Sequence, residues 1–302
     1  MRALSIFILQ GLCLSLLPAM AMAEEDPRDA FILSASTTLS ADVAAQESAV
    51  WRVMNGFGHV NLSGNGLFLA SRSRESMARG WVAFQIREYR GGTRGVSAQL
   101  MSGYDVPVMR QSRAGLALTL ARADLDTGEE VRSRTLSFGP YIRTQVGEHM
   151  KLKTWMSLAR PVYRLAGGGK TRATRLAAGA RAYFDRRLGA LKLSGSASLA
   201  LSRQVVPELG DLSGFEISKR NASLSARATF RPDRDLRPFV GFGLSDGRWR
   251  KPSGSGAYTT PRLSTGISWS HKRRSLSLSV DSSRVFDPDR PLTLNTTYRT
   301  RF

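Results

Sequence analysis

Apolar and polar residues alternate along most of this chain with a period of two, in segments separated by turn residues. In residues 275–281 (SLSLSVD) the alternation is nearly perfect, and residues 191–202 follow the same pattern. A helix would need apolar residues three and four positions apart, which these segments do not offer. Weak alternation repeated many times is typical of transmembrane β-barrels. We therefore predict an all-β chain that forms a transmembrane antiparallel barrel.

The number and spacing of these segments predict the topology. Their starts lie near Gly80, Gly95, Gly115, Arg132, Met150, Arg172, Leu191, Asn221, Leu236, Pro261, Ser275 and Leu292. Connections after even-numbered segments are mostly short, and those after odd-numbered segments are mostly longer and polar or glycine-rich. Outer-membrane barrels have short periplasmic turns and longer extracellular loops. The pattern predicts a barrel of about twelve strands over residues 80–302, with both barrel termini in the periplasm.

Large aromatic residues fall at one level of the predicted barrel. The lipid-facing positions near the periplasmic ends of downward strands hold Tyr104, Phe184, Phe230, Trp269 and Phe302. Aromatic girdles of barrels lie at the membrane–water interface. We therefore predict a periplasmic aromatic girdle, whose last member ends the final strand.

Basic residues dominate the opposite face. The chain has a formal net charge of +20. Alternation assigns the following side chains to the lumen: Arg87, Arg143, Lys151, Lys153, Arg175, Arg181, Lys192, Arg227, Arg237, Arg262 and Arg299. Facing lipid at mid-membrane would cost each of them about 2–4 kcal/mol. A basic lumen concentrates anions or seats an acidic plug, for which Asp42 and Glu47 are candidates. The alternative is that about half of these residues lie solvated at the rim.

The first residues have the pattern of an export signal. Arg2 precedes an apolar run over residues 3–17, and Ala21-Met22-Ala23 forms an A-x-A cleavage site. We predict a signal peptide over residues 1–23, which would also remove Cys13, the single cysteine. Export argues against nucleic acid as the partner of this basic chain.

Residues 24–79 differ from the rest of the chain. Residues 41–54 favour helix, with Ser40 as a possible N-cap and Gly56 as a stop. We predict that this helix is a plug segment. Residues 57–70 could form a short hairpin, and the strand count would be fourteen if that hairpin joined the barrel.

Catalytic and metal chemistry find little support in the sequence. The histidines are His59, His149 and His271. None falls at the extracellular side of the predicted barrel, where an outer-membrane hydrolase would need one beside a serine or carboxylate. We predict no enzyme activity, no catalytic residue, no cofactor and no metal site.

Short glycine and aromatic patterns add a resemblance to a known family. They are Trp81-Val82-Ala83-Phe84, Gly103-Tyr104-Asp105, Gly115-Leu116-Ala117-Leu118, Phe138-Gly139-Pro140-Tyr141 and the terminal Phe302. Over residues 80–302 the chain resembles the C-terminal translocator domain of autotransporters, the type V secretion family. The resemblance implies a bacterial outer-membrane location, twelve strands and a pore helix, here residues 41–54. It departs from the family because residues 24–79 leave no room for an ordinary passenger.

Two functions remain open at this point. The first is an autotransporter-like translocator or pore without a full-size passenger. The alternative is a small anion-selective porin for acidic solutes. For either function we expect as partners the outer-membrane lipid and lipopolysaccharide, and the barrel assembly machinery, whose recognition signal the strand ending in Phe302 resembles.

Overall fold

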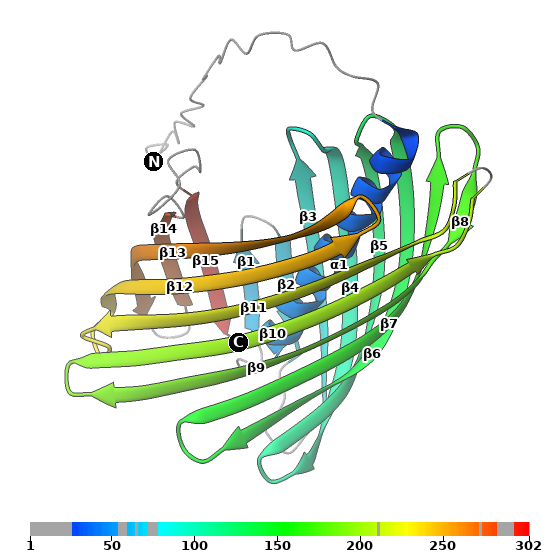
Figure 1. Ribbon diagram of the computed structural model, residues 1–302. Coiled ribbons are helices and arrows are strands. Elements are labelled where there is room, and N and C mark those ends of the chain that lie inside the picture. The colour runs from blue at the N-terminus through cyan, green and yellow to red at the C-terminus, as the bar shows by residue number, and fades with distance from the viewer. Residues whose placement is uncertain are drawn as a thin grey trace, which may run out of the picture.

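The computed structural model describes residues 26–53, 59–63, 66–71, 78–209, 212–271, 274–282 and 293–301. The predicted signal peptide, Gly56 and Phe302 lie outside these residues. The described residues form one closed antiparallel barrel around a single helix, α1 (Pro27–Val53) (Figure 1). The strands are β1 (His59–Ser63), β2 (Gly66–Ala70), β3 (Arg79–Tyr89), β4 (Arg94–Met109), β5 (Ser112–Asp126), β6 (Glu130–Val146), β7 (Met150–Leu165), β8 (Lys170–Arg172), β9 (Thr174–Leu188), β10 (Leu191–Val206), β11 (Phe215–Phe230), β12 (Leu236–Lys251), β13 (Gly254–His271), β14 (Arg274–Ser282) and β15 (Thr293–Arg301).

The wall consists of fourteen strands, because β8 and β9 form one continuous strand. Both pair with β7, and Ala173 between them donates its backbone N–H to the carbonyl of Pro161 over 2.8 Å. Neighbours along the chain pair with each other throughout. The barrel closes where β1 pairs with β15, with Val60 opposite Thr300 and Leu62 opposite Tyr298.

The prediction of twelve strands is therefore wrong, and the alternative of fourteen holds. The two additional strands are β1 and β2, which lie between β15 and β3. Each is five residues long, too short to show a clear alternation. They complete the hydrogen bonding of the wall, because the backbone N–H and C=O groups of β15 and β3 would find no partners in lipid without them. The wall accordingly begins at His59 rather than near residue 80.

Helix α1 is longer than the predicted segment 41–54 and begins at Pro27 instead of after Ser40. Asp26 caps it, because its carboxylate accepts the backbone N–H of Arg28 over 2.9 Å. Proline suits the first helical position, because the backbone N–H that it lacks would have no acceptor within the helix at this position. The first half is rich in serine and threonine, which have weak helix propensity. No helix among the described residues combines the length and hydropathy of a membrane span.

The inward and outward faces of the wall follow the predicted period of two. Along β6, Val131, Ser133 and Thr135 are buried, whereas Leu136 and Phe138 are exposed. Exposed leucine, valine and phenylalanine side chains recur on the outward face of almost every strand. The fold thus presents an apolar band to its surroundings, as a barrel in lipid does.

Candidate functional site: the lumen and its helix

Helix α1 lies inside the barrel and packs mainly against β2 to β6 and β10. Its first turns lie at the end of the barrel that carries the β5–β6 connection. There the Thr127 hydroxyl donates to the carbonyl of Ala30 over 2.7 Å, and the hydroxyls of Ser34 and Thr127 are 2.8 Å apart. The helix ends at Val53, near the opposite end, where β1 begins. At about 1.5 Å per residue, its 27 residues are long enough to pass through the whole lumen.

A buried ion pair holds the middle of α1 to the wall. Asp42 on α1 pairs with Arg175 on β9, and their side chains are 14% and 3% exposed. Gln99 donates to the same carboxylate over 2.9 Å. On its other side the Arg175 guanidinium donates to Gln204 over 2.8 Å, and Gln204 in turn contacts the Tyr163 hydroxyl. This cluster, which we call the Asp42–Arg175 anchor, joins α1 to β4, β7, β9 and β10.

Further polar contacts fix the first half of the helix. Lys219 on β11 donates to the carbonyl of Ser36 over 2.8 Å and to the hydroxyl of Ser40. The hydroxyl of Thr38 contacts that of Tyr163 over 3.1 Å. The ring of Phe31 packs edge-on against Tyr163 and Phe215. The serine and threonine residues that weaken the helix in isolation are therefore the ones that bind it to the wall.

A second buried cluster lies within the wall, at the opposite end from the β5–β6 connection. Asp105 is 1% exposed and pairs with Arg79 over 2.9 Å and with Arg113 over 2.6 Å. The Tyr141 hydroxyl also donates to Asp105, over 3.0 Å, and accepts the indole N–H of Trp81 over 2.8 Å. Neither Arg79 nor Arg113 is among the cations that alternation assigned to the lumen. The need to neutralise an inward carboxylate is the signal that could have identified them.

The structure distributes the eleven basic residues assigned to the lumen over three regions. Lys153 and Arg175 are buried, and Arg143, Lys151 and Arg181 are half-buried on the same stretch of wall. Arg87 lines a cavity of about 440 Å³ beside α1, together with Arg52 and Gln85. The remaining residues lie on β10 to β15: Lys192, Arg227, Arg237, Arg262 and Arg299. Of these, Lys192 pairs with Asp185 over 2.8 Å, and Arg227 lies 3.4 Å from the ring centre of Phe239.

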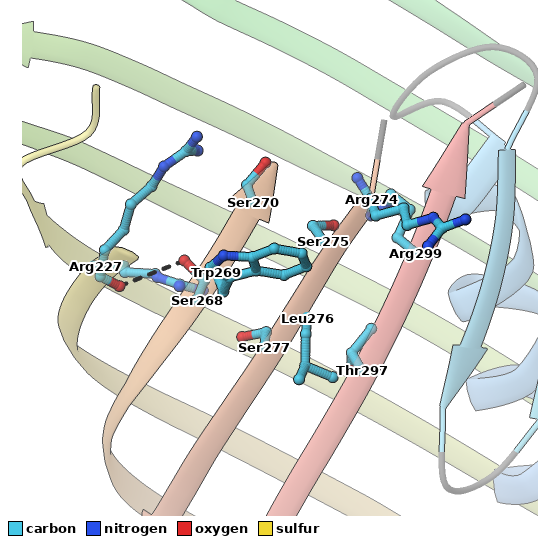
Figure 2. Close-up of a pocket in the computed structure, with 11 residues that line it drawn as sticks. Arg227, Ser268, Trp269, Ser270, Arg274, Ser275, Leu276, Ser277, Thr297 and Arg299 are labelled. Atoms are coloured by element: carbon cyan, nitrogen blue, oxygen red, sulfur yellow. Dashed lines mark hydrogen bonds between the residues drawn. The ribbon is translucent and has the colours of Figure 1, made fainter. Parts of the chain in front are cut away.

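Part of the lumen remains unfilled beside β11 to β15. A pocket of about 460 Å³ lies there, and Figure 2 shows Arg227 and Arg299 at opposite sides of it. Serines from β13 and β14, among them Ser268 and Ser277, line its wall with Thr297. Among the described residues that line the pocket there is no carboxylate. We call this region the open side of the lumen, and its chemistry favours anions and water.

The residues of the predicted girdle lie on the outward face. Tyr104, Phe184, Phe230 and Trp269 are all exposed, and each lies near the end of its strand that leads into a short connection. Phe302 lies outside the described residues.

The histidines occupy turns or strand ends. His271 contacts the Asp235 carboxylate over 2.8 Å, with both side chains about half exposed, and His149 lies in the exposed β6–β7 turn. The side chain of His59 is outside the described residues. Within the described part of the chain, no group of three or more potential ligands could hold a metal ion.

Comparison with solved structures identifies the kind of fold. The β domain of the Bordetella autotransporter BrkA matches 81% of this chain and all of its own, with 16% identity and a TM-score of 0.50. The monoaromatic hydrocarbon channel TodX matches 84% of this chain and 93% of its own, with 8% identity and a TM-score of 0.52. The translocator domain of the autotransporter NalP from Neisseria meningitidis covers 94% of this chain and all of its own, with 14% identity and a TM-score of 0.49.

The sequence itself matches no protein-family model and no curated protein. What the structural matches share with this chain is the fold. The chain therefore has the fold of an outer-membrane β-barrel, similar to that of an autotransporter translocator domain with a helix inside.

Proposed function

We propose that this protein is a translocator-type pore of the bacterial outer membrane whose lumen is closed by its own helix α1. The observation that carries the proposal is the Asp42–Arg175 anchor, which binds α1 to the inner wall through a buried ion pair. Removing one partner of such a pair typically costs 3–5 kcal/mol, because the other charge remains buried and unpaired. A helix held in this way is a resident plug.

The orientation of α1 also supports this proposal. The loops at the end that carries the β5–β6 connection are those predicted to be extracellular. A segment preceding Pro27 would therefore emerge at the cell surface, and β1 would start in the periplasm. This is the arrangement that a barrel needs if it carries an N-terminal segment across the membrane.

The open side of the lumen favours a second function, a small anion-selective channel. Its pocket of about 460 Å³ is lined by arginine, serine and threonine side chains and lies beside the helix. A path along β11 to β15 would allow small anions to pass while α1 stays in place. The two functions differ in whether α1 controls the conductance.

Single-channel conductance in planar bilayers tests the proposal. The mature chain is compared with a variant that lacks residues 24–53 and keeps the hairpin of β1 and β2, which belongs to the wall. We expect a low conductance that rises sharply on deletion. The same steady, anion-selective conductance in both proteins would refute the plugged pore and establish the small channel.

A further inference from the structure

Exposed basic side chains gather on the outward face of the barrel, near the β5–β6 and β7–β8 connections. We call this group the outer basic patch; it consists of Arg122, Arg132, Arg134, Arg160, Arg164, Lys170 and Arg172. Most of these residues line a groove of about 490 Å³ on the outside of the wall. The patch is separate from the lumen and from the helix that occupies it.

The strand register places like charges directly opposite one another in this patch. Arg122 faces Arg134 across β5 and β6, and Arg132 faces Arg164 across β6 and β7. Arg164 also faces Lys170 on β8. Like charges in directly opposed positions destabilise a sheet, so this arrangement is unfavourable unless an anion lies between them.

The carboxylates of the patch neutralise only part of this charge. Asp124 pairs with Arg122 over 3.0 Å, and Glu130 pairs with Arg132 over 2.7 Å. The five other members form no ion pair with any residue that the structure describes: Arg134, Arg160, Arg164, Lys170 and Arg172. An excess of exposed positive charge therefore remains on a surface that faces outward.

The level of the patch in the membrane follows from β6. Its outward residues Leu136, Phe138 and Ile142 are exposed and apolar, and Arg134 is the next outward residue toward the β5–β6 connection. A cation on the lipid face is costly at mid-membrane and costs little at the interface. The patch thus lies at the boundary of the apolar band, at the head groups of one leaflet.

We propose that the outer basic patch binds the phosphate groups of lipopolysaccharide in the outer leaflet. Guanidinium groups bind phosphate through paired N–H donors, and the neighbouring strands that carry them lie about 4.7–4.9 Å apart. Lipid A carries its phosphates at the level where these side chains end. The inference rests on the orientation given under the proposed function, which places the β5–β6 connection outside.

Binding of purified lipid A to the refolded mature protein in detergent tests this inference. The test variant is Arg134→Gln/Arg164→Gln, which removes two cations without an ion pair among the described residues. The matched control is Arg186→Gln/Arg234→Gln, which removes two exposed cations at the opposite end of the barrel. Heat-dependent gel mobility verifies that each variant is folded. The probes are bis-phosphorylated lipid A, mono-phosphorylated lipid A, phosphatidylglycerol and inorganic phosphate.

We expect the test variant to bind bis-phosphorylated lipid A about thirty-fold more weakly than the unmodified protein does. The control variant should bind it as tightly as the unmodified protein. Mono-phosphorylated lipid A should bind more weakly, and phosphatidylglycerol and inorganic phosphate weakest of all. Equal affinity in the test variant, an equal loss in the control, or equally tight binding of phosphatidylglycerol or inorganic phosphate would overturn the inference. The conductance of the test variant should not change. A failure of the lipid A inference is therefore distinguishable from a failure of the plugged pore, which only the conductance measurement reports.

Discussion

Asp105 shows how single residues hold the wall together. Its carboxylate is almost fully buried and is surrounded by Arg79, Arg113 and the hydroxyl of Tyr141. Trp81 completes the cluster through its indole N–H. Aromatic rings need space, and glycines provide it: a Cβ on Gly103 would come within 2.5 Å of the Trp81 ring. The Trp81 ring therefore occupies space that a side chain at position 103 would fill.

Among the glycines that the structure describes, Gly139 is the position where a side chain would conflict most directly with the wall. A Cβ there would lie 1.8 Å from the backbone oxygen of Met156. We predict that Gly139→Ala lowers the free energy of unfolding by about 1–3 kcal/mol, the usual cost of overpacking, because the backbone of β7 must move. Urea unfolding in lipid vesicles measures this change.

The control for this prediction is Gly80→Ala, since a Cβ at Gly80 would meet no atom closer than 4.0 Å. Its unfolding should match that of the unmodified protein. Equal stability of all three proteins would show that the wall between β6 and β7 is looser than described.

At the scale of elements, the sequence predicts the long strands well and the short ones poorly. The period of two extends over 15 to 18 residues in β5, β10 and β13, which is enough to exclude a helix. Strands β1 and β2 have five residues each. Their pairing with β15 and β3 identifies them as strands of the barrel wall. The sequence of the hairpin contains no sign of these long-range contacts.

The start of α1 was missed for a related reason. Residues 34–40 (SASTTLS) read as a poor helix, because serine and threonine compete for backbone hydrogen bonds. In the barrel the same hydroxyls bond back within the helix or to the wall, as Thr38 does to Ser34 and to Tyr163. Likewise, the charge pattern names Asp42 as a candidate plug residue and Arg175 as a lumen cation, but it does not reveal that these two residues pair with each other. Tertiary contacts decide both features.

The hairpin of β1 and β2 allows a test at this scale. We predict that deleting residues 59–70 prevents formation of a heat-stable barrel, because β15 and β3 would then lose their partners on one side. The chain that lacks residues 24–53 should fold, since it retains every strand. Heat-dependent gel mobility after refolding distinguishes the two variants. A stable barrel without the hairpin would show that twelve strands suffice.

At the scale of the whole molecule, charge is divided between two surfaces. Cations in the lumen bind α1 and line the open side, whereas a separate group on the outward face forms the outer basic patch. The net charge of +20 therefore does not describe one uniform basic surface. The proposed pore function depends on the first group, and specifically on whether α1 stays in place.

A reversible tether tests most directly whether α1 closes the proposed pore. The variant carries three substitutions. Asp42→Asn leaves Arg175 buried without its carboxylate partner. Ser34→Cys and Thr127→Cys place two thiols where two hydroxyls lie 2.8 Å apart in the native chain. In the reduced state the open fraction should exceed that of the native protein by at least about a hundredfold. In the oxidised state the disulfide holds the first turns of α1 while its far end continues into the wall.

The decisive measurement is single-channel recording of this variant before and after reduction of the disulfide. We expect a closed pore in the oxidised state and frequent openings in the reduced state, in the same molecule. The same conductance in both states would contradict the proposed plugged pore, because the position of α1 would then have no control over the pore.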